Sequence, residues 1–251
     1  MTHVLPRLWS LWFFLLLVGY FLLAFPLYFV CLSIPSRLTQ DLAHRLNMLW
    51  GYVMTLPVLV FVQPVNREVI DRRQTYVFAP NHISYLDIVI CNIGIKNSFR
   101  FMGKAELAKL PLFGWMFSRL HIVVPRHSTT GAYRSFLQAK DKLQEGVSVL
   151  VYPEATILDK PPGTLGPFKG GAFRLAIDQQ VPIVPVTIVG SERVLPHDGK
   201  LLLRPGRIKI VFNAPIETVG LTVKDTSALK QKVRDIMLDN LATHHDNSYK
   251  I

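Results

Sequence analysis

The stretch Pro80-Asn81-His82-Ile83-Ser84-Tyr85-Leu86-Asp87 follows the apolar run Tyr76-Val77-Phe78-Ala79, and the two together indicate a strand that gives way to a helix. Pro80 favours a break here, because proline lacks a backbone donor and restricts the residue before it to extended conformations. On a single helix, the spacing of His82 and Asp87 would set their side chains about 140° apart. The two can therefore meet only if His82 lies in the turn after the strand and Asp87 lies in the following helix. A histidine oriented by a carboxylate can act as a general base, so this stretch is the candidate active site.

Composition limits the class of protein and of partner. The chain has 251 residues, of which 50% are hydrophobic, enough for one catalytic domain and a membrane-directed segment. Lys and Arg number 28 against 17 Asp and Glu, and the formal charge of +11 favours an anionic partner. Anionic lipid fits better than nucleic acid, because apolar residues are concentrated at the N-terminus and the chain has no zinc-finger spacing or basic zipper. Cys31 and Cys91 form neither a disulfide framework nor a metal site, and are predicted to be small buried hydrophobes in a reducing compartment.

The N-terminal part is strongly apolar. Residues 8–34 contain no charged side chain and are long enough to cross a hydrocarbon core of about 30 Å. This run exceeds the apolar region of a usual signal peptide, and Pro26 predicts a kink or a segment that enters and leaves one leaflet. A second run, residues 46–62, contains Gly51 and Pro57 and is at the lower limit for crossing. We predict a membrane-associated helical hairpin over residues 1–63, with either two spans or one span and one shallow helix.

From Gln63 onward, short apolar runs alternate with helical periodicity, which is typical of an α/β domain. Strands are expected at residues 76–79, 99–102, 122–124, 147–152, 183–189 and 208–212, and the clearest helices at residues 129–145 and 226–241. The predicted fold is a mixed central sheet flanked by helices, forming a catalytic domain over residues 64–251. The prolines of Val181-Pro182-Ile183-Val184-Pro185-Val186 predict an edge strand or a bulge there.

Charged side chains follow several of the expected strands. Lys104 and Arg126 each lie where a strand ends, a suitable position for a cation that faces a phosphate, although Arg126 could also be a simple surface arginine. Glu154 and Thr156 follow another strand, at the edge where open α/β sheets bind ligands. Lys169 precedes two glycines that would open a helix close to a ligand.

In this order and spacing the blocks resemble the glycerolipid acyltransferase family, whose best-known members are the 1-acylglycerol-3-phosphate acyltransferases, from residue 76 to about 190. The family's Asn-His-x4-Asp block is matched at Asn81, His82 and Asp87. Its apolar strand ending in arginine is matched by Arg126, and its Val-Pro-Ile-Val-Pro-Val strand by residues 181–186.

The family's Phe-Pro-Glu-Gly-Thr-Arg block is matched only in part, at Pro153, Glu154 and Thr156. Ala155 stands at the usual glycine and Ile157 at the usual arginine. A glycine usual near the start of the second block is also missing, with Leu120 and His121 in that region. His121 and His127 lack a companion carboxylate cluster, so no metal site is expected.

The resemblance implies a membrane-bound acyltransferase that moves a fatty acyl chain from acyl-CoA or acyl carrier protein to the free hydroxyl of 1-acylglycerol-3-phosphate, giving phosphatidic acid. His82, oriented by Asp87, would be the base in a direct transfer that needs no metal or other cofactor, although Ser84 is near enough for an acyl-serine step. The residues expected to bind substrate are Asn81, Lys104, Arg126, Glu154, Thr156 and Lys169.

The expected partners are the acyl donor, a lysophospholipid acceptor and membrane lipids, with no nucleic acid. The expected location is a membrane, with the catalytic domain facing the cytoplasm, as at a bacterial inner membrane. The missing arginine leaves open an acceptor that is another lysophospholipid or a lyso-aminolipid. Alternatives of a different class are a non-catalytic membrane lipid-binding protein of the same fold and a metal-dependent hydrolase.

Overall fold

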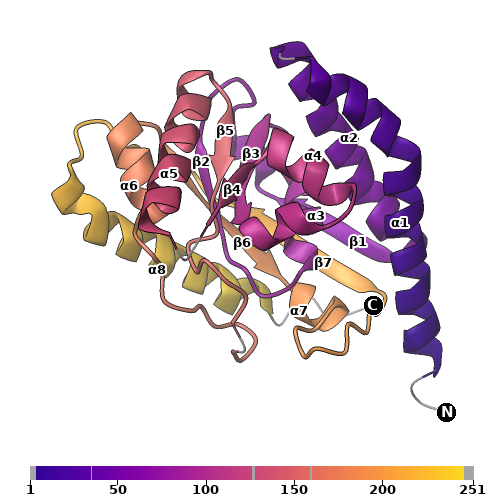
Figure 1. The fold of residues 1–251 in the computed structure, drawn as a ribbon. Helices are drawn as coiled ribbons and strands as arrows, with labels where there is room; N and C mark the ends of the chain where they lie inside the picture. Colours follow the sequence, from indigo (N-terminus) through magenta and orange to yellow (C-terminus); the bar gives the residue numbers. More distant parts are fainter. Residues whose placement is uncertain (1–3, 35, 126–127, 159, 246–251) are drawn as a thin grey trace.

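The fold has three layers, a central sheet between two layers of helices (Figure 1). The computed structural model describes residues 4–34, 36–125, 128–158 and 160–245. Within these residues the sheet has seven strands in the order β1-β7-β6-β2-β5-β3-β4. The strands are β1 Val60–Val65, β2 Val77–Pro80, β3 Phe99–Lys104, β4 Ile122–Val124, β5 Ser148–Leu150, β6 Ile183–Val189 and β7 Gly206–Phe212. The predicted mixed sheet flanked by helices is confirmed.

The direction of the strands creates one edge suited to a site. Strands β6, β2, β5, β3 and β4 are mutually parallel, so their carboxyl ends meet at the same edge of the sheet. Strand β7 runs antiparallel to β6, and β1 runs parallel to β7. Ligands of open α/β sheets bind outside the carboxyl ends of the parallel strands.

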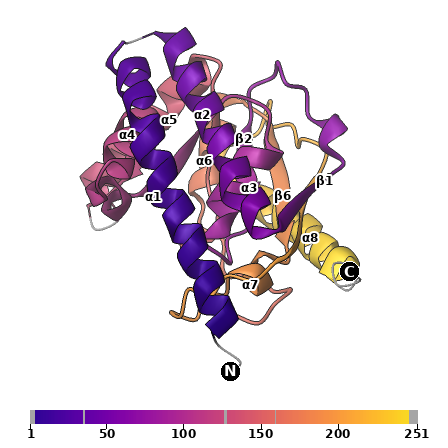
Figure 2. The same cartoon turned by 90° about the vertical axis from the view of Figure 1, so that its right-hand side faces the viewer.

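Each face of the sheet is covered by its own helices, with an apolar core beneath each set (Figures 1 and 2). One layer contains α1 Val4–Ser33, α2 Arg37–Thr55, α3 Leu86–Gly94 and α4 Phe113–Leu120. The other contains α5 Thr129–Gln144, α6 Gly171–Gln179 and α8 Thr226–His245, and the short α7 Ser191–Val194 follows β6. Short 3-10 helices occur at Leu56–Val58, Arg67–Val69, Ala105–Lys109 and Val223–Asp225.

Helices α1 and α2 form an antiparallel hairpin, and α1 lies against the domain along most of its length (Figure 2). Near its start, Trp9 Nε1 donates to the Val58 carbonyl oxygen at 3.0 Å. Farther along, Phe21 contacts Trp50, and Phe29 stacks on Trp115 with ring centroids 5.4 Å apart. At the α-helical rise, these contacts extend over about 30 Å.

The opposite face of α1 is apolar and exposed. Five leucine and valine side chains at helical spacing are each more than half exposed: Leu8, Leu11, Leu15, Val18 and Leu22. We call this surface the outer face of α1. Among the described residues, one helix, Pro6–Ser33, is long and apolar enough to cross a membrane by length and composition. Such a face needs an apolar environment, which a lipid bilayer supplies.

The second apolar run is not a single element, contrary to the expectation for residues 46–62. Helix α2 ends at Thr55, a 3-10 turn follows, and Leu59 adopts a left-handed backbone with φ of 55° before β1 begins. Strand β1 was not predicted. It lies at the edge of the sheet, where Pro64 is tolerated because one side of the strand needs no ladder donor. Strand β1 spans Val60–Val65, so it crosses the predicted boundary between residues 63 and 64. The division into residues 1–63 and 64–251 remains a proposal.

The prediction of an edge strand or bulge at residues 181–186 is wrong. Strand β6 is interior and fully buried, with β2 on one side and β7 on the other. Its Pro185 lies one residue beyond the last pair of the β6–β7 ladder, Val186 with Phe212. The missing N–H of the proline is therefore not required there, and the Pro185 carbonyl oxygen accepts the Asn213 N–H at 3.2 Å.

Candidate active site

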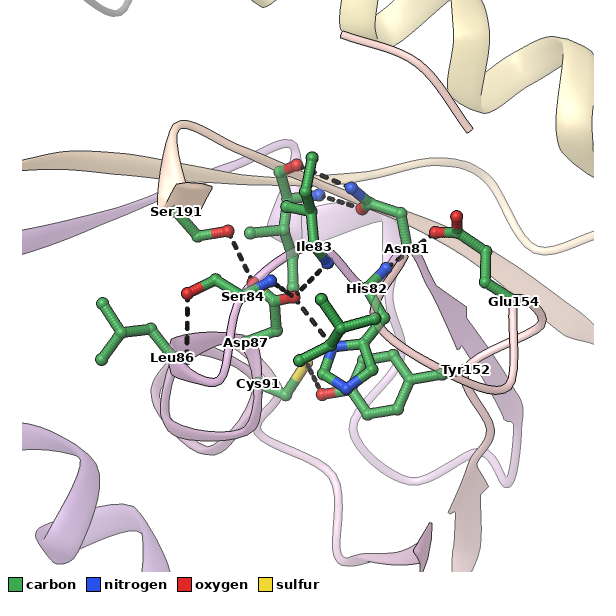
Figure 3. A network of polar contacts seen from close by, with 12 residues as sticks. Asn81, His82, Ile83, Ser84, Leu86, Asp87, Cys91, Tyr152, Glu154 and Ser191 are labelled. Carbon is green, nitrogen blue, oxygen red and sulfur yellow. Dashed lines mark hydrogen bonds and ion pairs between the residues drawn. The ribbon is translucent and has the colours of Figure 1, made fainter. Parts of the chain in front are cut away.

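His82 and Asp87 meet at the carboxyl end of β2, with the geometry that their spacing requires. His82 lies in the turn after Pro80, and Asp87 lies in the first turn of α3. Their side chains are joined by a contact of 2.9 Å between His82 Nδ1 and Asp87 Oδ2 (Figure 3).

Asp87 is fully buried and is surrounded by hydrogen-bond donors. Its Oδ2 accepts the backbone N–H groups of Ile83 at 2.8 Å and Ser84 at 2.9 Å, and its Oδ1 accepts the Ser191 hydroxyl at 2.6 Å. Because backbone N–H groups can only donate, Oδ2 must be an acceptor, and His82 Nδ1 must carry the hydrogen. The other ring nitrogen, Nε2, then has a free lone pair and can accept a proton.

The imidazole of His82 is also held by its neighbours. It stacks on the ring of Tyr152, with centroids 4.0 Å apart and an interplanar angle of 16° (Figure 3). Burial raises the pKa of Tyr152 well above its ordinary value, so this ring stays neutral, and its hydroxyl donates to Cys91 Sγ at 3.7 Å. The His82 side chain retains 13% exposure, so the ring is fixed without being sealed from a substrate.

An apolar cavity of about 360 Å³, which we call the site cavity, opens beside His82. Its wall includes Phe101, Met102, Leu107, Phe117 and Ile157, which come from β3, α4 and the segments that follow β3 and β5. Lys104 also lines it, and Lys104 Nζ lies 3.5 Å from Thr156 Oγ1. The cavity therefore offers apolar surface together with a cation. Thr156 is not part of its lining but contacts Lys104, so these two residues, both predicted to bind substrate, do lie together.

Two other predicted binding residues have their polar groups bonded within the protein. Glu154 is buried, with Oε1 accepting the His82 N–H at 2.9 Å and Oε2 accepting the Gly166 N–H at 2.6 Å and pairing with Lys160. Asn81 is buried and joins β2 to β6 through both backbone groups of Ile188, with bonds of 3.0 and 2.7 Å. These contacts position the His82 turn rather than present free groups to a substrate.

Of the remaining predicted residues, Lys169 is exposed near the start of α6 and is not part of the site cavity. Arg126 and His127 lie outside the described residues. Among the described residues, no group of three or more His, Cys, Asp or Glu side chains could hold a metal ion.

Sequence reasoning missed Ser191 and Lys160. Ser191 follows β6 and lies 104 positions from Asp87 in the chain, so only the β2–β6 pairing brings it to the carboxylate. Lys160 is six positions from Glu154, in a segment with no periodicity, and only the buried ion pair identifies it.

Ala155 has a backbone conformation that favours glycine, with φ of 61°. A side chain in the left-handed region costs about 1–2 kcal/mol. The same residue lines the site cavity. Ala155, which stands at the usual glycine of the motif, therefore introduces local backbone strain beside the site cavity.

Comparisons of the sequence with a family model and with known proteins all match acyltransferases. A family model described as Acyltransferase matches residues 62–189, about half of the chain. A 1-acyl-sn-glycerol-3-phosphate acyltransferase of Chlamydomonas reinhardtii is 32% identical over 77% of this chain and 59% of its own length. A chloroplastic 1-acyl-sn-glycerol-3-phosphate acyltransferase of Brassica napus is 30% identical over 72% of this chain and 52% of its own length. The chain thus spans between half and three fifths of these relatives.

A solved structure covers the whole fold. The crystal structure of the 1-acyl-sn-glycerophosphate acyltransferase PlsC from Thermotoga maritima superposes with a TM-score of 0.82, covers 97% of each chain and is 22% identical. The likeness is one of fold, and at 97% coverage it includes the N-terminal helices and the last helix.

Proposed function

Because the chain belongs to the acyltransferase family, we propose that it is a membrane-bound enzyme that moves a fatty acyl chain from a thioester donor to the free hydroxyl of 1-acylglycerol-3-phosphate. The observation that carries this proposal is the 2.9 Å contact of His82 Nδ1 with the buried Asp87 carboxylate, which leaves Nε2 free beside an apolar cavity. The names of the relatives from Chlamydomonas reinhardtii and Brassica napus support the same acceptor.

In the proposed reaction, His82 Nε2 takes the proton of the acceptor hydroxyl as its oxygen attacks the carbonyl carbon of the thioester. A carbon–oxygen bond forms and a tetrahedral intermediate results. As it collapses, the carbon–sulfur bond breaks, and the departing thiolate takes the proton from Nε2. Asp87 stabilises the imidazolium that exists between the two proton transfers. No covalent acyl-enzyme is needed.

Ser84 is poorly suited to carry an acyl group. It is fully buried, and its hydroxyl donates to the Leu195 carbonyl oxygen at 2.7 Å and accepts the Leu86 N–H at 3.2 Å. A nucleophile must approach the carbonyl carbon and be deprotonated by a base in contact with it. These bonds support the direct transfer.

The polar end of the acceptor would lie near Lys104, and the acyl chain being transferred would lie in the apolar part of the site cavity. We assign Lys104 and Thr156 to the phosphate and glycerol end of the acceptor, since a cation beside a hydroxyl suits a phosphate. Arg126 remains a candidate for the same role, and Lys169 for contact with the donor, acyl-CoA or acyl carrier protein. Asn81 and Glu154 would act indirectly, by fixing the turn that carries His82.

The outer face of α1 would bring the enzyme to its lipid substrates. A lysolipid and a long acyl chain are both membrane-resident, and withdrawing them costs about 0.8 kcal/mol per CH₂ group. Because α1 contacts the domain over most of its length, we propose that it lies within one leaflet rather than crossing the bilayer. The catalytic domain would then lie on one side of the membrane, which we assign to the cytoplasm because acyl-CoA and acyl carrier protein are made there.

A product assay tests the proposal. Purified protein in detergent is incubated with acyl-CoA or acyl carrier protein donors and with lysophosphatidic acid, other lysophospholipids and a lyso-aminolipid, and the product mass is measured. We expect phosphatidic acid as the main product and no loss of activity on addition of a chelator. Turnover with a different acceptor alone would reassign the substrate, and no turnover with any acceptor would favour a lipid-binding protein. Activity abolished by the chelator and restored by metal would favour the metal-dependent alternative.

A further inference from the structure

A second apolar cavity adjoins the site cavity. It has a volume of about 500 Å³ and is lined by Phe13, Phe14 and Leu17 of α1, Trp50 of α2, Val89 of α3 and Leu201, among others. We call it the tail cavity. Tyr85 and Ile88 line both cavities, so the two share a wall directly after the His82 turn.

The proposed reaction brings two acyl chains to one catalytic histidine, the chain being transferred and the chain that the acceptor already carries. The two cavities have volumes of about 360 and 500 Å³, and each falls in the range of about 300–1,000 Å³ that is typical of ligand pockets. Both have mainly apolar walls. The mechanism described above uses only the site cavity, which leaves the tail cavity without a role.

The arrangement of polar groups indicates which chain each cavity takes. In the acceptor, the reacting hydroxyl lies between the phosphate and the existing acyl ester. If the phosphate contacts Lys104, which lines only the site cavity, the existing chain must leave His82 in another direction. Tyr85 and Ile88 line both cavities, so the tail cavity is the adjoining apolar space in that other direction.

The tail cavity is also the one that borders the lipid-facing helix. Three of its lining residues, Phe13, Phe14 and Leu17, belong to α1. Phe14 is 38% exposed, on the same helix as the exposed leucines of the outer face. A lysolipid could thus pass its chain from the bilayer into the tail cavity sideways, without leaving an apolar environment.

We propose that the tail cavity binds the acyl chain that the lysophospholipid acceptor already carries, and that Leu17 and Val89 help to set the chain length the enzyme accepts. This inference rests on the proposed function. The donor chain would occupy the site cavity, on the Phe101 and Phe117 side of the shared wall.

Two substitutions on the same helix form a matched pair. Leu17→Trp adds bulk inside the tail cavity. Gly19→Trp, two positions later, adds bulk in a separate groove between α1 and α2, where a Cβ atom would meet nothing within 4 Å. Both variants place a tryptophan on the membrane-associated helix, so a general effect on membrane binding or folding would appear in both.

The readout is kcat/KM for lysophosphatidic acid with an oleoyl or an octanoyl chain, and separately for oleoyl-CoA and octanoyl-CoA. We expect Leu17→Trp to lower kcat/KM for the oleoyl acceptor by about tenfold, equal to about 1.4 kcal/mol, and to affect the octanoyl acceptor little. Its preference among donors should not change, and Gly19→Trp should match the wild type. A changed donor preference with an unchanged acceptor preference, or equal effects of the two variants, would overturn the proposal.

A binding measurement separates this inference from the proposed activity. Lysophosphatidic acid with a diazirine near the end of its chain is photocrosslinked to the His82→Ala protein, and the modified peptides are identified by mass spectrometry. We expect crosslinks at Phe13 to Leu17 and in the segment that contains Leu201, and their loss in Leu17→Trp. Crosslinks confined to Phe101, Met102 or Phe117 would overturn the assignment, whether or not the wild type turns over lysophosphatidic acid.

Discussion

Asp87→Asn is the change that tests the electrostatic part of the mechanism. In the wild type, Oδ2 accepts His82 Nδ1–H and two backbone N–H groups, while Oδ1 faces the Ser191 hydroxyl. An asparagine amide can fit only with its oxygen toward the three N–H donors. Its NH₂ group would then face Ser191, whose hydroxyl can rotate and accept. The substitution should therefore keep the hydrogen on Nδ1 and remove only the negative charge.

The size of the effect follows from that lost charge. Opposite charges about 4 Å apart interact by about 4 kcal/mol at an effective dielectric constant of about 20. If this stabilises the imidazolium in the transition state, its loss lowers kcat by about a thousandfold. The His82–Asp87 contact of 2.9 Å and the complete burial of Asp87 support an interaction of this size.

The assay is the initial rate with lysophosphatidic acid and acyl-CoA in detergent, with thermal unfolding to verify that the variant is folded. We expect Asp87→Asn to lose about a thousandfold in kcat with little change in KM for the acceptor, and to remain more active than His82→Ala. A loss below tenfold would refute the role of the Asp87 charge. A loss equal to that of His82→Ala would refute the orientation deduced for the amide.

Three further outcomes are expected. Ser84→Ala should lower kcat by less than about tenfold, because its hydroxyl only supports the turn; an acyl adduct on the wild-type protein, seen by intact mass, would contradict direct transfer. Ala155→Gly should raise the free energy of unfolding by about 0.5–1 kcal/mol, because it relieves a φ of 61°; a lower melting temperature would contradict this. Burial, and then the charge of Arg100, lowers the pKa of His44 from 6.5 to about 4. Between these two pH values the unfolded chain therefore binds a proton that the folded protein does not. The free energy of unfolding, measured by denaturant titration, should fall by up to about 3 kcal/mol as the pH drops from 6.5 to about 4. His44→Leu should lack this part of the decrease, and a His44→Leu protein whose free energy of unfolding depends on pH as the wild type's does would contradict the assignment.

The sequence predicts the interior of the sheet well, because buried parallel strands form short continuous apolar runs. The strands at residues 122–124 and 183–189 have the predicted bounds, and α5 begins at the predicted Thr129. Strand β1 was missed because its first residues continue the apolar run of α2, and because Pro64 argues against a strand unless the strand is known to be at an edge. That position depends on the pairing of β1 with β7, which local sequence does not encode.

In the candidate site, too, contacts set by local sequence could be predicted, and contacts between residues far apart in the chain could not. The meeting of His82 and Asp87 follows from local spacing and a proline, so it could be predicted. The contacts of Glu154 and Asn81 could not, because Glu154 receives the backbone N–H of a residue 72 positions away and Asn81 joins a strand 107 positions away. Their membership of a motif suggested contact with the substrate, whereas in the structure Asn81 bonds to the backbone of Ile188, and Glu154 bonds to two backbone N–H groups and to Lys160.

The central claim is that His82 is the general base of an acyl transfer. Its most direct test is the amount of phosphatidic acid formed by His82→Ala from lysophosphatidic acid and acyl-CoA, with lysophosphatidic acid binding measured on the same preparation. We expect product formation to fall by at least about a thousandfold while binding stays close to that of the wild type, because the imidazole is needed for proton transfer, whereas it is only one of many side chains that line the site cavity. A His82→Ala protein that binds the lipid and still forms product at a rate near that of the wild type would contradict the claim.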